Sequence, residues 1–257
     1  MTDSTGPIGA EATGMMTGIG TDTGATATNA STVGATTAGT TGTKICGLTN
    51  EADLAAAVDA GADAVGFVVS VSVNSPREIA PERARELVAA VPPSVSSVVV
   101  TMADAADATE RAVSLVEEAN PDALQVHAAS PEEVASIRVA ITVPVIAAID
   151  ARADSAEFSE AADALLVDSL DAAGAGGTGE TGDWERAREI VAESTVPVIL
   201  AGGLDPENLS RAVERAQPFA VDVASGVEKH GGVKDHDAVR AFVARATATR
   251  PGAAVRS

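Results

Sequence analysis

Two side chains of this sequence stand where proton-transfer chemistry would be placed. The single cysteine, Cys46, ends a short apolar run, and Asp168 follows the apolar run 164–167. A thiol and a carboxylic acid on different elements can remove and deliver protons at two positions of one sugar. A free thiol with a pKa of about 8.5 is mostly protonated at pH 7, so either another group must lower its pKa or its position must supply the base. We therefore expect turnover to rise with pH as the thiol ionises.

Glycine-rich loops near the end of the chain indicate a phosphate site. Their bare backbone N–H groups can approach an anion closely, although a single glycine pair also suits an ordinary tight turn. Three such loops in succession favour phosphate binding by Gly177, Thr178, Gly202, Gly203, Ser225 and Gly226. Lys229 and Lys234 flank the last of these loops and would leave positive charge near the phosphate.

Further polar residues follow other apolar runs. Arg77 lies in a polar loop, where it would either bind a substrate carboxylate through a bidentate pair or remain a solvated surface residue. Gln125 and His127 end the run that begins at residue 123, and we assign them supporting contacts to the substrate.

The elements that must position these residues alternate regularly. Eight apolar runs are typical of parallel strands buried on both faces, at residues 44–48, 64–69, 97–102, 123–126, 143–149, 164–167, 196–201 and 220–223. Amphipathic stretches follow them at 51–60, 81–90, 108–118, 131–139, 155–162, 184–193, 206–215 and 237–246, with the fifth the weakest. Eight strand–helix units predict a single α/β domain, a (β/α)8 TIM barrel, with its chemistry at the carboxyl ends of the strands.

Composition sets the domain limits. Residues 1–43 are mostly Gly, Thr, Ala and Ser and predict a low-complexity disordered tail, because they cannot bury enough apolar surface to offset the entropy of ordering. The barrel domain is assigned to residues 44–249, and residues 250–257 to a short flexible tail.

Charge and cysteine content limit the partners. A formal charge of −20 repels nucleic acid and anionic membranes, and no apolar run is long enough to span a bilayer. The acidic, lysine-poor composition resembles proteins of salt-loving microbes, and an ordinary acidic cytosolic enzyme is the alternative. One cysteine excludes an intramolecular disulfide and a multi-cysteine zinc site. We expect a cytoplasmic protein, a monomer or homodimer, that acts on a small sugar phosphate.

Several motifs, taken together and in order, resemble the phosphoribosylanthranilate isomerase family. They are Lys-Ile-Cys-Gly-Leu-Thr at 44–49, Gly-Ala-Asp-Ala-Val-Gly-Phe at 61–67, Ser-Pro-Arg at 75–77, Gln-Val-His at 125–127, Leu-Val-Asp-Ser at 166–169, Gly-Gly-Thr-Gly at 176–179, Leu-Ala-Gly-Gly-Leu-Asp-Pro-Glu-Asn at 200–208 and Ala-Val-Asp-Val-Ala-Ser-Gly-Val-Glu at 220–228. The resemblance covers about residues 44–247 and implies an isomerase of tryptophan biosynthesis in a halophilic archaeon.

The resemblance also implies roles for individual residues and the absence of any metal or organic cofactor. Asp168 would be the general acid and Cys46 the general base of an Amadori rearrangement. Arg77 would hold the anthranilate carboxylate, and Asp222 would lie near the anthranilate amine.

Three alternatives remain open at the level of sequence. A bifunctional isomerase that also serves histidine biosynthesis would have aspartate at the position of Cys46. Indole-glycerol-phosphate synthase would need catalytic lysines that this chain lacks. A barrel that kept only its phosphate site would act as a binding or regulatory module, and the presence of both Cys46 and Asp168 argues against it.

Overall fold

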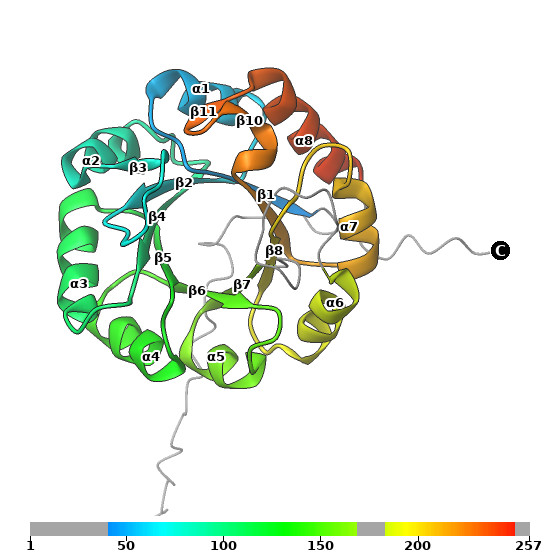
Figure 1. Ribbon diagram of the computed structural model, residues 1–257. Helices are drawn as coiled ribbons and strands as arrows, with labels where there is room; N and C mark the ends of the chain where they lie inside the picture. Colours follow the sequence, from blue (N-terminus) through cyan, green and yellow to red (C-terminus); the bar gives the residue numbers. More distant parts are fainter. Residues whose placement is uncertain (1–40, 169–182, 250–257) are drawn as a thin grey trace, which may run out of the picture.

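The computed structural model describes residues 41–168 and 183–249. Its centre is a closed barrel of eight parallel strands (Figure 1). They are β1 (Gly42–Cys46), β2 (Ala64–Val69), β4 (Ser96–Met102), β5 (Ala123–His127), β6 (Val145–Asp150), β7 (Ala164–Asp168), β8 (Val198–Ala201) and β9 (Ala220–Val223). The barrel closes because β1 pairs with β2 on one side and with β9 on the other.

Eight helices form a ring outside the strands, as Figure 1 shows. They are α1 (Glu51–Asp59), α2 (Pro81–Ala89), α3 (Ala108–Ala119), α4 (Pro131–Ala140), α5 (Ser155–Ala161), α6 (Trp184–Glu193), α7 (Leu209–Ala216) and α8 (His236–Ala248). The predicted (β/α)8 barrel is therefore confirmed, including the fifth helix.

Two predicted boundaries differ from the structure. The helix expected at 206–215 begins only at Leu209. The carboxylate of Asp205 accepts hydrogen bonds from the backbone N–H groups of Glu207 and Asn208 and holds these residues in a turn, as aspartate often does. At the start of the barrel, β1 begins at Gly42, whose N–H donates to the carbonyl of Phe219 and ties the first strand to the last. The predicted tails, except for residues 41–43, lie outside the described residues.

The strands have two apolar faces with different partners. Odd-numbered positions of β1 and β7, such as Ile45 and Leu165, pack against the helices in the larger core. Alternate positions, such as Cys46, Val98 and Leu166, point into the barrel and form a second, smaller cluster. Because side chains alternate along a strand, residues two apart share one face. The next position on the inner face after Leu166 is Asp168, whose side chain therefore projects into the mouth of the barrel.

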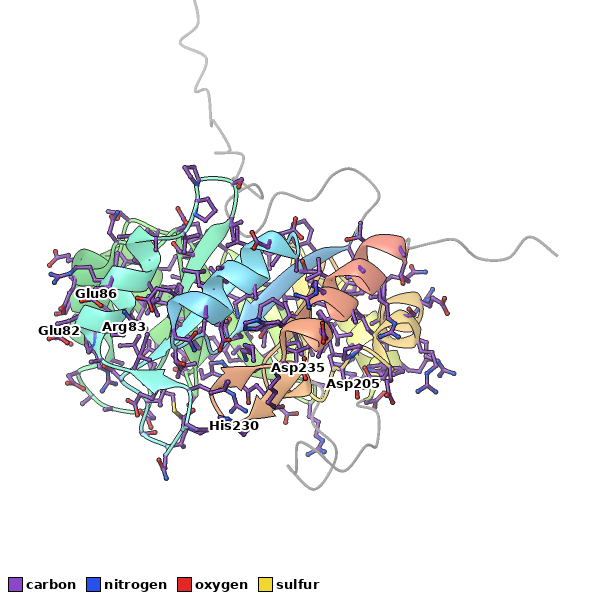
Figure 2. The ribbon with its side chains drawn as sticks, turned by 90° about the horizontal axis from the view of Figure 1, so that it is seen from above. Glu82, Arg83, Glu86, Asp205, His230 and Asp235 are labelled. Atoms are coloured by element: carbon purple, nitrogen blue, oxygen red, sulfur yellow. The ribbon has the colours of Figure 1, made fainter. Side chains whose placement is uncertain are left out.

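Three short strands were not predicted from the sequence, whereas a short helix was expected after the last strand of the barrel. β3 (Glu78–Ile79) extends the sheet beside β2, β10 (Glu228–His230) and β11 (Val233–Lys234) form a hairpin, and η2 (Ser225–Val227) is one 3-10 turn after β9. Seen from the side in Figure 2, the hairpin with His230 and the loop with Asp205 lie toward the same end of the barrel. This end carries the carboxyl ends of the strands.

The outer surface is held in part by arginine. Arg83 on α2 donates from Nη1 and Nη2 to the two carboxylate oxygens of Glu51 at 2.7 and 2.6 Å, and it also pairs with Glu86 (Figure 2). Among the residues that the structure describes, no helix has the length and apolar character needed to cross a membrane.

Candidate active site

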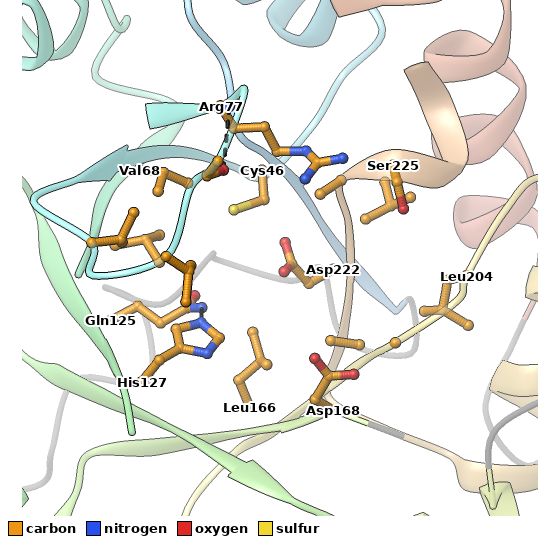
Figure 3. A pocket seen from close by; sticks show the side chains of 18 of the residues that line it. Cys46, Val68, Arg77, Gln125, His127, Leu166, Asp168, Leu204, Asp222 and Ser225 are labelled. Carbon is orange, nitrogen blue, oxygen red and sulfur yellow. Dashed lines mark hydrogen bonds between the residues drawn. The ribbon is translucent and has the colours of Figure 1, made fainter. Parts of the chain in front are cut away.

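A pocket of about 370 Å³ opens at the carboxyl ends of the strands (Figure 3). Its size lies within the usual range for small-molecule sites. Cys46 from β1, Asp168 from β7 and Asp222 from β9 all line it. In Figure 3 the thiol and the Asp168 carboxylate lie on opposite sides of the pocket, with the Asp222 carboxylate between them. The two residues expected to transfer protons are thus brought together across a space that a small sugar could occupy.

Cys46 is 6% exposed and points into the barrel at the end of β1. Burial raises the pKa of its thiol, because an apolar environment disfavours the thiolate, and the charge of Asp222 adds to this. The positive charges of Lys44 and Lys234 act in the opposite direction. The net pKa lies above the ordinary value, so the thiol predominates at neutral pH.

Asp168 ends β7 and has the properties of a general acid. Its pKa is raised to about 6. Burial is the largest cause, and the negative charges of Asp222 and Asp150 also contribute. Within the described part of the chain, its Oδ1 is buried and has no hydrogen-bond partner. A carboxyl group with a raised pKa and an uncommitted oxygen can hold a proton and give it to a substrate oxygen.

Gln125 and His127 lie on the inner face of β5 and contact each other. The Gln125 Nε2 is 2.8 Å from the His127 Nε2. Since the amide nitrogen is a donor, the imidazole nitrogen must accept, which places the His127 proton on Nδ1. Burial lowers the pKa of His127 to about 4, and the charge of Lys44 contributes. At neutral pH the ring is therefore an uncharged hydrogen-bond donor at the pocket wall, which fits the predicted supporting role.

Arg77 lines the pocket from the loop after β2, but one edge of its guanidinium is already occupied. Its Nε and Nη2 donate to the two carboxylate oxygens of Glu228, both at 2.8 Å. The hydrogen bonds that Arg77 donates to Glu228 raise the pKa of Arg77. A substrate carboxylate would therefore have to use the other edge, formed by Nη1 and Nη2. The Arg77 guanidinium, which the sequence predicted to bind substrate, is thus held in place by the carboxylate of Glu228.

Lys234 does not provide the positive charge expected near the phosphate. Its side chain is 0% exposed, and its Nζ donates to Glu228 at 2.8 Å and to the carbonyl of Ala224 at 3.0 Å. The backbone N–H of Lys234 donates to Asp53 at the start of α1. Lys234 is thus a buried anchor for Glu228, because a lysine is stable in the interior only when it is paired.

The predicted phosphate-binding residues fall into three groups. Gly202, Gly203 and Ser225 line the pocket. Gly202 and Gly203 have φ of 86° and 61°, in the left-handed region that favours glycine. Gly226 does not line the pocket, and a Cβ there would collide with the backbone carbonyl of Leu204, so glycine is needed for the two loops to pack. Gly177 and Thr178 lie outside the described residues.

Reasoning from sequence missed three residues at or below the site. Lys44, directly opposite Asp222 in the β1–β9 register, forms an ion pair with it at 2.9 Å. Gly66, opposite Cys46 in the β1–β2 register, leaves space for the thiol. Glu228 holds Arg77. The motif Lys44-Ile45-Cys46 contained a signal for the first of these, because a lysine two residues before an inward-facing residue of a buried strand must also face inward.

The fold and the site together define a single-domain (β/α)8 enzyme that acts at the carboxyl ends of its strands, with a thiol and a carboxylic acid facing one pocket. Comparison with protein families is more specific. Residues 43–245 match the family described as N-(5'-phosphoribosyl)anthranilate (PRA) isomerase. The chain belongs to this family.

Individual relatives agree with this assignment. The N-(5'-phosphoribosyl)anthranilate isomerase of the halophilic archaeon Natronomonas pharaonis is 56% identical over 201 residues, which cover 78% of this chain and 95% of the relative. The crystal structure of the Thermus thermophilus phosphoribosyl anthranilate isomerase is similar, with a TM-score of 0.69, 36% identity, and coverage of 81% of this chain and 100% of that chain.

A third relative was crystallised with a bound molecule. This phosphoribosyl anthranilate isomerase was solved in complex with reduced 1-(o-carboxyphenylamino)-1-deoxyribulose 5-phosphate. Its TM-score is 0.66 at 32% identity, covering 81% of this chain and 99% of that chain.

Proposed function

We propose that this chain converts N-(5'-phosphoribosyl)anthranilate to 1-(2-carboxyphenylamino)-1-deoxyribulose 5-phosphate. As a member of its family, the chain is an isomerase of tryptophan biosynthesis. The observation that carries the specific mechanism is that Cys46 and Asp168 face one pocket from opposite sides, with Asp222 between them.

In the first step Asp168 acts as the general acid. Its carboxylic acid gives a proton to the ring oxygen of the furanose, the bond between that oxygen and C1 breaks, and the nitrogen lone pair forms a C=N bond to C1. The product of this step is an open-chain iminium cation. Asp222 carries a negative charge close to where this cation forms, which supports the role of a stabilising group beside the amine.

In the second step Cys46 acts as the general base. Its thiolate takes the proton from C2, and the electron pair of that C–H bond forms a C1=C2 double bond while the iminium nitrogen becomes neutral. The resulting enolamine tautomerises to the ketone. The two proton transfers occur at the ring oxygen and at C2, which are both bonded to C1. Two groups on different sides of the sugar, such as those at the ends of β1 and β7, can make them.

The remaining contacts follow the chemistry of the substrate. Arg77 would bind the anthranilate carboxylate through the edge formed by Nη1 and Nη2, and Gln125 with His127 would contact the substrate from β5. The phosphate would lie against Gly202, Gly203 and Ser225, together with Gly177 and Thr178. We further propose that the protein acts in the cytoplasm as a monomer or homodimer and binds no nucleic acid.

Purified protein assayed with phosphoribosylanthranilate at high salt tests this proposal. We expect Cys46→Ala and Asp168→Ala each to lower kcat by about 10² or more, with KM largely kept, because each removes a positioned proton-transfer group. Ser159→Ala, a change of one buried side chain on α5, is the matched control and should retain full turnover. No turnover by the wild-type protein would instead favour a binding module, and near-full activity of either site variant would remove that residue from the mechanism.

A further inference from the structure

Lys44 is a buried cation at the site that the proposed mechanism does not use. Its side chain is 3% exposed, and it points into the barrel two residues before Cys46 on β1. Its Nζ donates to the Oδ1 of Asp222 at 2.9 Å. Structural lysines seldom occupy the interior of a barrel, because an ammonium loses its hydration there and must be compensated by a partner. A methionine or leucine would fill this volume without that cost, so the charge itself needs an explanation.

The position of Lys44 relative to the thiol is fixed by Gly66. A Cβ placed on Gly66 would lie 2.9 Å from the Cys46 Sγ and 3.2 Å from the Lys44 Nζ. Both atoms therefore converge on the small space above this glycine. The ammonium is paired with Asp222 and lies near the sulfur, in a region with little exposure to solvent.

We propose that Lys44 is a positioning residue for the base: its ammonium, held between Asp222 and Cys46, stabilises the thiolate and thereby sets how much of the base is available. This inference rests on the proposed function, because it concerns the step assigned to Cys46. Lys44 would then be a group that favours ionisation of the thiol, which the sequence alone did not identify.

The charges around Cys46 support this assignment. Burial raises the pKa of the thiol, and Lys44 is the largest influence that lowers it, ahead of Lys234. Arg77 is a further cation near the sulfur. Across the pocket His127 is uncharged, and Asp168, with a pKa of about 6, is a carboxylate at the pH where the thiol ionises, in the wild type and the variants alike.

Asp222 connects the charge of Lys44 to the reaction. In the resting site the Lys44 ammonium pairs with the Asp222 carboxylate, and this pairing weakens its stabilisation of the thiolate. When the ring opens, the substrate nitrogen becomes cationic and gives Asp222 a second partner. The ammonium then acts more strongly on Cys46, at the moment when the thiolate is needed. Lys44 and Asp222 thus link formation of the iminium to availability of the base.

The test uses the fact that Cys46 is the only cysteine of the chain. The rate of alkylation by iodoacetamide as a function of pH reports the ionisation of this one thiol, without substrate. The ultraviolet absorbance of the thiolate gives the same midpoint without a reagent having to enter the pocket. Both are measured in about 2 M KCl, where surface charges are screened but buried pairs are not.

We expect Lys44→Met to move the ionisation midpoint up by about 1 to 3 pH units, the usual effect of losing a close opposite charge. Asp222→Asn should lower the ionisation midpoint, because the Lys44 ammonium then has no carboxylate partner there and stabilises the thiolate more strongly. Lys229→Met is the matched control: it makes the same chemical change at an exposed lysine and should leave the midpoint unchanged.

A second comparison covers the case in which Lys44→Met fails to fold with an unpaired Asp222. The double variant Lys44→Met/Asp222→Asn has no buried charge at this place, so its midpoint should lie above that of Asp222→Asn by a similar amount. An unchanged or lowered midpoint on removal of Lys44, in either background, overturns the proposal. This result is independent of isomerase activity: absence of turnover in the wild type would instead remove the proposed function.

Discussion

The dependence of kcat/KM on pH should have an unusual form, because the pKa values of the two catalytic groups are in reversed order. Asp168 must be protonated to act as the acid, yet its pKa is about 6. Cys46 must be deprotonated to act as the base, yet burial raises its pKa above the ordinary value of a thiol. At neutral pH the free enzyme is therefore mostly carboxylate and thiol. The active form has Asp168 as carboxylic acid and Cys46 as thiolate. It carries the same number of protons, with the proton on Asp168 instead of Cys46.

The size of the effect follows from these values. Between pH 6 and the pKa of the thiol, each step of pH ionises Cys46 tenfold more and leaves Asp168 tenfold less protonated, so the two changes cancel. The active form then makes up about 10⁻³ of the free enzyme or less, and its share is constant across this range. Below pH 6 the share falls tenfold per pH unit, because Asp168 is fully protonated and only the loss of thiolate remains.

The assay is kcat/KM for phosphoribosylanthranilate from pH 4.5 to 9 at constant high KCl, corrected for uncatalysed loss of substrate. Circular dichroism at each pH serves as the control for folding. We expect a plateau above about pH 6 and an acid limb below it. In contrast to the expectation from the sequence alone, we expect no rise through neutral pH, since Asp168 loses its proton over the same interval. A tenfold rise per pH unit from 7 to 9, or no decline down to pH 5, would refute this reasoning.

Three further perturbations test other parts of the site. Glu228→Gln should raise KM several-fold with kcat nearly kept, because Arg77 loses the carboxylate that orients its fork; equal kinetics for Glu228→Gln and wild type would show that Arg77 needs no such support. Gly66→Ala should lower kcat by about tenfold or more while the far-ultraviolet dichroism is unchanged, since its Cβ would lie 2.9 Å from the Cys46 Sγ and displace the thiol; wild-type turnover would mean that the sulfur has room to move. Raising KCl from about 0.1 to beyond 1 M should increase both Tm and kcat/KM, because a net charge of −20 repels itself and an anionic substrate until it is screened; a decrease in both would contradict adaptation to salt.

The fold was predictable because each strand is buried on both faces. A continuous apolar run such as residues 64–69 marks a strand wherever it pairs, so eight runs with helices between them define the barrel without knowledge of any contact. The strands β3, β10 and β11 were not predictable in this way. They have two or three residues each, too few to show a period, and β10 carries the charged residues Glu228 and Lys229.

From the sequence, the only site residues that could be predicted were those that stand at the end of an apolar run or in the loop after it. Cys46 and Asp168 were found because each ends an apolar run. The pairs Lys44–Asp222 and Arg77–Glu228 were not found, because each joins residues more than 150 positions apart, and their contact depends on how the barrel closes. Lys234 was misplaced for a related reason: its charge suggested a surface, whereas its burial follows from partners on α1 and in the last loop.

The ion pair between Lys44 and Asp222 also has a consequence for synthesis of the chain. Lys44 leaves the ribosome early, and its partner follows 178 residues later, about 10 to 40 seconds at ordinary rates of translation. During this interval β1 carries an ammonium with no counter-charge, which opposes its burial. Burial of the first strand is therefore fully compensated only once the last strand has been made. A chain that stops before Asp222 would lack the counter-charge that stabilises Lys44 in the interior.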